Sequence, residues 1–108
     1  LDREVSRSRG EIEQATAQIA RVQAAIGEAQ RKIQETELTF RNEARKEMAR
    51  IERALTRLAE REDRVHAQMA KEATDHLAVL RLNGDLRAIV DERDDLEMAW
   101  LAAAEIVG

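Results

Sequence analysis

Histidines and neighbouring carboxylates are the side chains of this chain whose types could support metal or acid–base chemistry. The two histidines are His66 and His76. A metal site needs at least a third ligand at a suitable spacing, and none accompanies them. Asp94 and Asp95 are adjacent, so on a helix they point in different directions and cannot work as a paired acid and base. With no nucleophile beside a base and no phosphate-binding glycine loop, the sequence predicts a protein that is not an enzyme and needs no cofactor or metal.

A row of basic residues is the second pattern that could bind a ligand. Its members recur every three or four residues, at Lys46, Arg50, Arg53, Arg57, Arg61 and Arg64. A basic helix face is typical of proteins that contact nucleic-acid phosphates. The candidate nucleic-acid contacts are Lys46, Arg50, Arg53 and Arg57. An acidic group follows later in the chain, at Asp91, Glu92, Asp94, Asp95 and Glu97. We favour the simpler interpretation, in which the two groups face each other or water.

The composition indicates long helices rather than a compact globule. Charged residues make up 37% of the 108 residues and aromatic residues 2%, while proline and cysteine are absent. Such a chain can bury a narrow apolar seam but lacks the bulky groups that fill a rounded core. No uncharged apolar run approaches the roughly 18 residues of a membrane span, and no signal-peptide pattern is present. We therefore expect no direct membrane insertion.

The first part of the chain carries a heptad pattern. Large apolar residues recur every seven positions, at Val5, Ile12, Ile19, Ile26, Ile33 and Phe40. Smaller residues follow three positions later, at Ala15, Val22 and Ala29. This spacing predicts a coiled-coil seam. After Phe40 the register slips by one residue and the seam continues to Met69, a change that alters supercoiling without breaking a helix. One helix is therefore predicted over residues 2–72.

A turn and a second helix follow. Thr74 and Asp75 are good N-cap residues, because their side-chain oxygens can accept hydrogen bonds from the free amides of a new helix. A turn is therefore predicted over residues 73–75 and a helix over residues 76–107. The predicted fold class is all-α. It consists of an antiparallel coiled-coil hairpin at residues 44–108 and an N-terminal helical extension at residues 1–43.

Seam residues of both helices form the predicted core of the hairpin. They are Met48, Ile51, Leu55, Leu58, Val65, Leu82, Leu86, Ile89, Leu96 and Trp100. With the chain folded at the turn, Trp100 is expected to oppose Met48, a large residue against a flexible one. Glu62 and Arg93 are the two polar seam residues. Each is expected to face a leucine and to extend its charged end outward.

Residues 1–39 have an apolar seam that the hairpin does not cover. An isolated helix of this composition is marginally stable in water, so its stripe needs a packing partner. We expect association with another copy, giving a homo-oligomer, or with a different partner. The predicted association residues are Val5, Ile12, Ile19, Val22, Ile26 and Ile33. The rival arrangement is a three-helix bundle with a break near Asn42, but the neighbouring residues include no glycine or proline to form that turn.

The first half resembles a known family. The residues that carry the resemblance are Leu1-Asp2-Arg3-Glu4, Gly10-Glu11-Ile12, Ile19-Ala20-Arg21, Ile26 with Glu28, and Phe40 with Glu43. Over residues 1–50 they are similar to the second hairpin helix of HlyD-type periplasmic adaptors, the membrane fusion proteins of type I secretion. The resemblance implies an oligomeric rod that bridges an ABC exporter and an outer-membrane channel. The family's lipoyl domain has no counterpart here, and its channel-contacting tip precedes the matched segment.

The second half resembles a different family. Its markers are Arg45-Lys46-Glu47, Ala73-Thr74-Asp75-His76, Glu92-Arg93-Asp94-Asp95-Leu96-Glu97 with Trp100-Leu101, and Ala104-Glu105. Over residues 44–108 they are similar to the C-terminal coiled-coil arm of ABC-F ATPases. The resemblance implies an antiparallel hairpin that can contact nucleic acid or the ribosome. No ATP-binding motif is present, so it implies no ATPase activity.

The two resemblances meet near residues 40–50. We interpret the chain as an adaptor helix joined to a stable hairpin, either in a natural hybrid or, as we favour, by grafting. The expected function is that of a helical segment of a secretion adaptor, with exporter or channel components as partners and a periplasmic location. The alternative is an ABC-F arm that binds nucleic acid or the ribosome in the cytoplasm.

Overall fold

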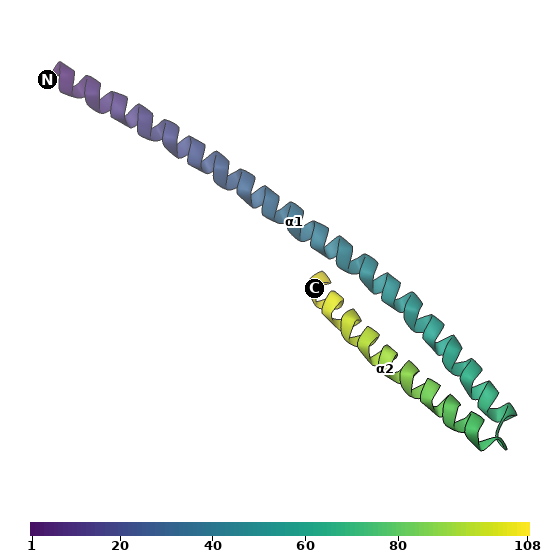
Figure 1. The fold of residues 1–108 in the computed structure, drawn as a ribbon. Coiled ribbons are helices and arrows are strands. Elements are labelled where there is room, and N and C mark those ends of the chain that lie inside the picture. The colour runs from purple at the N-terminus through teal and green to yellow at the C-terminus, as the bar shows by residue number, and fades with distance from the viewer. The chain divides into compact units, whose positions relative to one another are not determined.

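Two helices and a short turn make up the structure, a computed structural model that describes residues 1–108 (Figure 1). Helix α1 spans Asp2–Lys71 and helix α2 spans His76–Val107. The chain divides into two units, Leu1–Thr39 and Phe40–Gly108. The predicted all-α fold with an antiparallel hairpin is confirmed. Helix α1 ends one residue earlier than predicted, at Lys71, because Glu72 already belongs to the turn.

The sequence of α1 supports an uninterrupted helix. Alanine, glutamate, arginine, glutamine and leucine dominate it, and these residues have high helix propensity. Asp2 and Glu4 lie in its first turn and Lys71 in its last, where their charges oppose the helix dipole favourably. The helix continues through Thr39 and Glu43 without a break. A three-helix bundle with a turn near Asn42 is therefore not formed.

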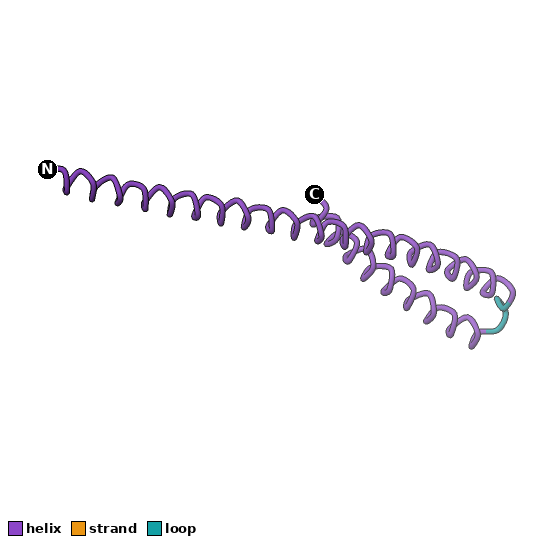
Figure 2. Tube along the Cα trace, turned by 90° about the horizontal axis from the view of Figure 1, so that it is seen from above, coloured by secondary structure: helices purple, strands orange, loops and turns teal.

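A short turn joins the helices (Figure 2). Two types of hydrogen bond close it. The backbone N–H of Asp75 donates to the carbonyl of Glu72 at 2.9 Å, which reverses the chain. The Asp75 carboxylate then accepts a hydrogen bond of 3.1 Å from the backbone N–H of Ala78 and so caps α2. Of the two candidate cap residues, Asp75 is the one used.

A narrow seam between α2 and the second part of α1 forms the core of the hairpin, where the two helices lie side by side (Figures 1 and 2). Six side chains in it are buried: Ala44, Ile51, Leu58, Leu82, Ile89 and Ala103. Half-buried residues lie between them at the same three- and four-residue spacing. Those that belong to the predicted core are Met48, Leu55, Val65, Leu86, Leu96 and Trp100. The hairpin is thus stabilised by one stripe of apolar residues from each helix.

The two polar seam residues, Glu62 and Arg93, contact each other, which the sequence analysis did not predict. The Arg93 guanidinium donates a hydrogen bond of 2.9 Å to the Glu62 carboxylate. Helical side chains lean toward the N-terminus of their own helix, so in an antiparallel pair Glu62 leans away from the turn and Arg93 leans toward it. The two charges therefore meet between the levels of their own Cα atoms.

Two further observations concern membranes and metals. Neither helix contains a stretch with the length and hydropathy of a membrane span. No cluster of three or more histidine, cysteine, aspartate or glutamate side chains has an arrangement that could hold a metal ion.

Candidate functional site: an uncovered apolar stripe and a basic row

The apolar stripe of the unit Leu1–Thr39 is uncovered. Every residue of this unit is exposed. The predicted association residues are between 51% and 66% exposed: Val5, Ile12, Ile19, Val22, Ile26 and Ile33. Side chains of this size are normally buried, and single exposed ones need no explanation, but a row of them on one helix face indicates a docking surface.

Heptad spacing places these side chains together. Residues seven apart on an α-helix are separated by two turns, so they lie on nearly the same face. A shallow hollow of about 490 Å³ lies on this face near its start and is lined in part by Val5, Ser8 and Ile12. Leu38 of the same unit and Phe40, the first residue of the hairpin unit, are also exposed, at 56% and 62%. Leu38 was not among the predicted association residues because it lies outside the heptad positions.

The basic row lies on one exposed face of α1 within the hairpin unit. Spacings of three and four residues keep its six members within about a quarter of the helix circumference. All six are exposed: Lys46, Arg50, Arg53, Arg57, Arg61 and Arg64. Basic side chains at this spacing lie along one line on the helix surface. Contact with successive phosphates of a nucleic acid requires such a line of cations.

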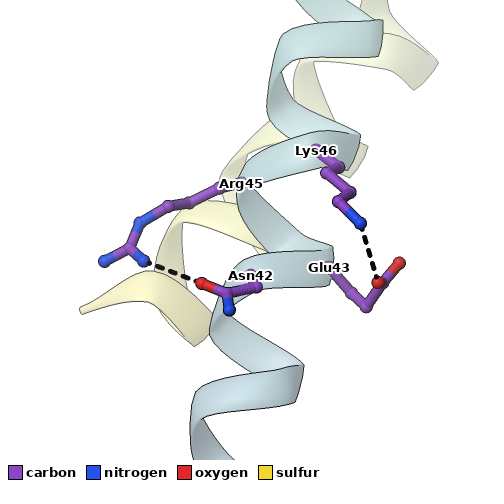
Figure 3. Close-up of polar contacts among 4 residues, drawn as sticks. All are labelled: Asn42, Glu43, Arg45 and Lys46. Atoms are coloured by element: carbon purple, nitrogen blue, oxygen red, sulfur yellow. Dashed lines mark hydrogen bonds and ion pairs between the residues drawn. The ribbon is translucent and has the colours of Figure 1, made fainter.

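Three members of the basic row are partly neutralised. Lys46 lies 3.4 Å from the Glu43 carboxylate, one turn earlier on the same helix (Figure 3). Arg50 donates two hydrogen bonds to Glu47, the one from Nε being 2.9 Å long. These bonds lower the pKa of the Glu47 carboxyl below its ordinary value and raise the pKa of the Arg50 guanidinium. Arg61 reaches Glu92 of α2 at 3.4 Å.

The other three members have no charged partner. Arg53, Arg57 and Arg64 form no ion pair and no side-chain hydrogen bond. Arg45, which neighbours the row, points to the other side of α1 and donates to Asn42 at 3.3 Å (Figure 3). This face therefore presents three guanidinium groups that no carboxylate of the chain neutralises.

The acidic group of α2 faces mainly solvent. Its five members are exposed: Asp91, Glu92, Asp94, Asp95 and Glu97. Only Glu92 forms an ion pair with the basic row, through Arg61. Exposed ion pairs of this kind contribute little to stability. Attraction between the basic row of α1 and the acidic group of α2 is therefore not what mainly holds the two helices together.

The tryptophan and the two histidines belong to neither the apolar stripe nor the basic row. Trp100 is half-buried, and its indole N–H donates to Glu52 at 3.2 Å, a contact that was not predicted. His66 is exposed, with Nε2 at 3.6 Å from the Glu62 carboxylate. His76 is exposed at the start of α2. Two contacts were therefore missed, the Trp100–Glu52 bond and the Glu62–Arg93 bond. The second had a signal, since the only two polar seam residues carry opposite charges.

Comparison with known proteins adds no relative to this description. No protein-family model, curated protein or solved structure matches the chain.

Proposed function

We propose that this chain is a non-enzymatic coiled-coil module whose residues 1–39 pack against another helix, and that it serves as a helical segment of a periplasmic type I secretion adaptor. The observation that carries the proposal is the continuous row of exposed β-branched residues on a unit that has no covering helix in the chain. Such a row is stable in water only when a partner buries it. The resemblance of residues 1–50 to the adaptor helix supplies the finer assignment, with exporter and channel components as partners.

Export of a type I substrate by a chimeric adaptor tests this function. In the chimera, residues 1–39 replace the adaptor's own second hairpin helix. Export should be retained. It should be lost when Ile12, Ile19 and Ile26 are changed to asparagine, because polar groups would then occupy the packed seam. The matched control carries asparagine at Ala17, Ala24 and Arg31, which lie on the opposite face of the same helix. Loss of export in both variants, or in the unaltered chimera, would contradict the adaptor assignment.

Nucleic-acid binding is the second candidate function. The specific observation in its favour is the set of free guanidinium groups of Arg53, Arg57 and Arg64 on one exposed face. A protein that uses them to neutralise phosphates should bind duplex RNA or DNA with an affinity that falls steeply with salt. The resemblance of residues 44–108 to the ABC-F arm favours the same surface.

Fluorescence anisotropy with a labelled RNA duplex tests this candidate. The variant Arg50→Glu, Arg53→Glu, Arg57→Glu should lose binding at low salt. A control with an equal change in charge, Arg7→Glu, Arg21→Glu, Arg31→Glu, should retain most of it. Equal losses in the two variants would indicate attraction by net charge alone and would exclude a dedicated basic face.

A further inference from the structure

The seam of the unit Leu1–Thr39 has two kinds of position. The first kind is β-branched, at Val5, Ile12, Ile19, Ile26 and Ile33, and all five are exposed. The second kind, three residues later, is mostly small: Ser8, Ala15, Val22, Ala29 and Thr36. β-Branched residues at the first seam position favour two parallel strands when leucine fills the second position. No leucine fills it here, so the charges beside the seam decide the orientation of the partner helix.

The charges beside this seam are complementary in one orientation. In a parallel pair in register, each residue that precedes a first-position residue lies near the partner's residue five positions later. This rule sets Glu4 against Arg9 of the second copy, and Lys32 against Glu37 of the second copy. Within the chain, Glu4, Arg9 and Glu37 have no ion pair, and Lys32 lies 3.9 Å from Glu28. Two-fold symmetry produces each attraction twice.

The antiparallel orientation is less favourable in charge. When all the seam positions overlap, Glu11 lies near Lys32 of the second copy, which is attractive. Asp2 lies near Glu37 of the second copy, which is repulsive. The antiparallel pair would match most isoleucines with a small residue, as Ile12 with Ala29, but Ile19 with Val22. The parallel pair instead stacks like residues, isoleucine on isoleucine and alanine on alanine.

We infer that the occupant of the stripe is a second copy of this chain, bound parallel and in register, with Glu4–Arg9 and Lys32–Glu37 pairs across the interface. The inference rests on the proposed function, because both concern the exposed apolar stripe of residues 1–39. The inference adds which helix covers that stripe. The thin layers bury little apolar area, so the dimer dissociates on dilution.

Engineered disulfides test the orientation. The chain has no cysteine, so each introduced thiol is unique. Full-length variants Ala15→Cys and Ala29→Cys are oxidised separately and run on a non-reducing gel. In the parallel dimer each cysteine faces itself, so both variants should form covalent dimer, about tenfold faster than a matched variant, Ala24→Cys, on the outer face. Equal rates in all three would show random collision and would overturn the inference.

Mixing distinguishes the antiparallel pair. Covalent dimer that forms only when Ile12→Cys is mixed with Ala29→Cys, and in neither variant alone, would also overturn the inference. Charge exchange gives an independent readout by light scattering. Glu37→Lys sets two lysines together across the parallel interface and should raise the dimer Kd about tenfold, and the further change Lys32→Glu should restore it. A full chain that is monomeric at all concentrations overturns this inference, while the adaptor assignment stands or falls separately on export by the chimera.

Discussion

Glu62 and Arg93, 31 residues apart in the chain, are joined by a hydrogen bond of 2.9 Å within the apolar seam of the hairpin. Their side chains are 31% and 37% exposed, so both charges are partly removed from water. A charge in this position is tolerated because its partner comes from the facing helix. The pair therefore favours one alignment of the two helices, since sliding one helix along the other would leave both charges against apolar groups.

Removing one member of this pair should destabilise the hairpin. We expect Glu62→Leu to lower the free energy of unfolding by about 1–2 kcal/mol, because the Arg93 guanidinium is left without its acceptor in a half-buried site. The double variant Glu62→Leu, Arg93→Leu should recover most of the loss. Urea unfolding can be followed through the fluorescence of Trp100, the single tryptophan. A double variant that is less stable than Glu62→Leu alone would contradict this account.

The buried seam layers should dominate stability. Ile51 is 0% exposed, and Ile51→Ala is expected to cost about 2–5 kcal/mol through lost burial and the cavity left behind. Met98 is 71% exposed on the same hairpin, so Met98→Ala should change the free energy of unfolding by less than about 0.5 kcal/mol. The same tryptophan-detected unfolding measures both variants. Similar effects at the two sites would mean that the helices do not pack along this seam.

The cap of α2 should depend on the side chain of Asp75. Asp75→Ala removes the acceptor for the Ala78 amide and is expected to lower the free energy of unfolding by about 1 kcal/mol. Asp75→Asn keeps an acceptor and should lose much less. Thr74→Ala serves as the neighbouring control, because Thr74 does not provide the cap. If Thr74→Ala proves the more costly substitution, the helix begins at a different residue in solution.

The Glu47–Arg50 pair should be visible in a pH titration. Because the hydrogen bond from Arg50 lowers the pKa of Glu47, the interaction stabilises α1 above the ordinary carboxyl pKa and is lost as the pH falls through the lowered value. Carbon-13 NMR of the Glu47 carboxyl in Arg50→Ala should show the midpoint rising toward its ordinary value. Arg53→Ala, which removes an unpaired arginine, should leave the midpoint unchanged. An unshifted midpoint in Arg50→Ala would mean that the pair is not formed in solution.

The helices and their seam were predictable from local patterns. Apolar residues at three- and four-residue spacing identified the side chains that the structure buries, such as Ile51 and Ile89, because helix periodicity is a property of sequence alone. The turn was predictable from the cap residue Asp75 for the same reason. The pairs within one helix, such as Lys46 with Glu43, also follow from spacing.

Contacts between the helices were harder to predict. The Glu62–Arg93 bond depends on the axial alignment of α1 and α2 and on the lean of each side chain, and neither quantity is encoded in a heptad count. The hydrogen bond from Trp100 to Glu52 likewise depends on how the two helices are aligned and on how each side chain leans. The stripe of residues 1–39 could also be identified from the sequence, and the structure leaves it exposed.

The shortness of the turn between Lys71 and His76 has a consequence for the rate of folding. Seam positions next to the turn, such as Met69 and Val79, are separated by few residues, so bringing them together costs little chain entropy. Once the first layer forms, each following layer adds about one helical turn from each side. The layers of the hairpin can therefore form one after another, starting beside Asp75. Helical proteins with such local contacts fold in about microseconds to milliseconds.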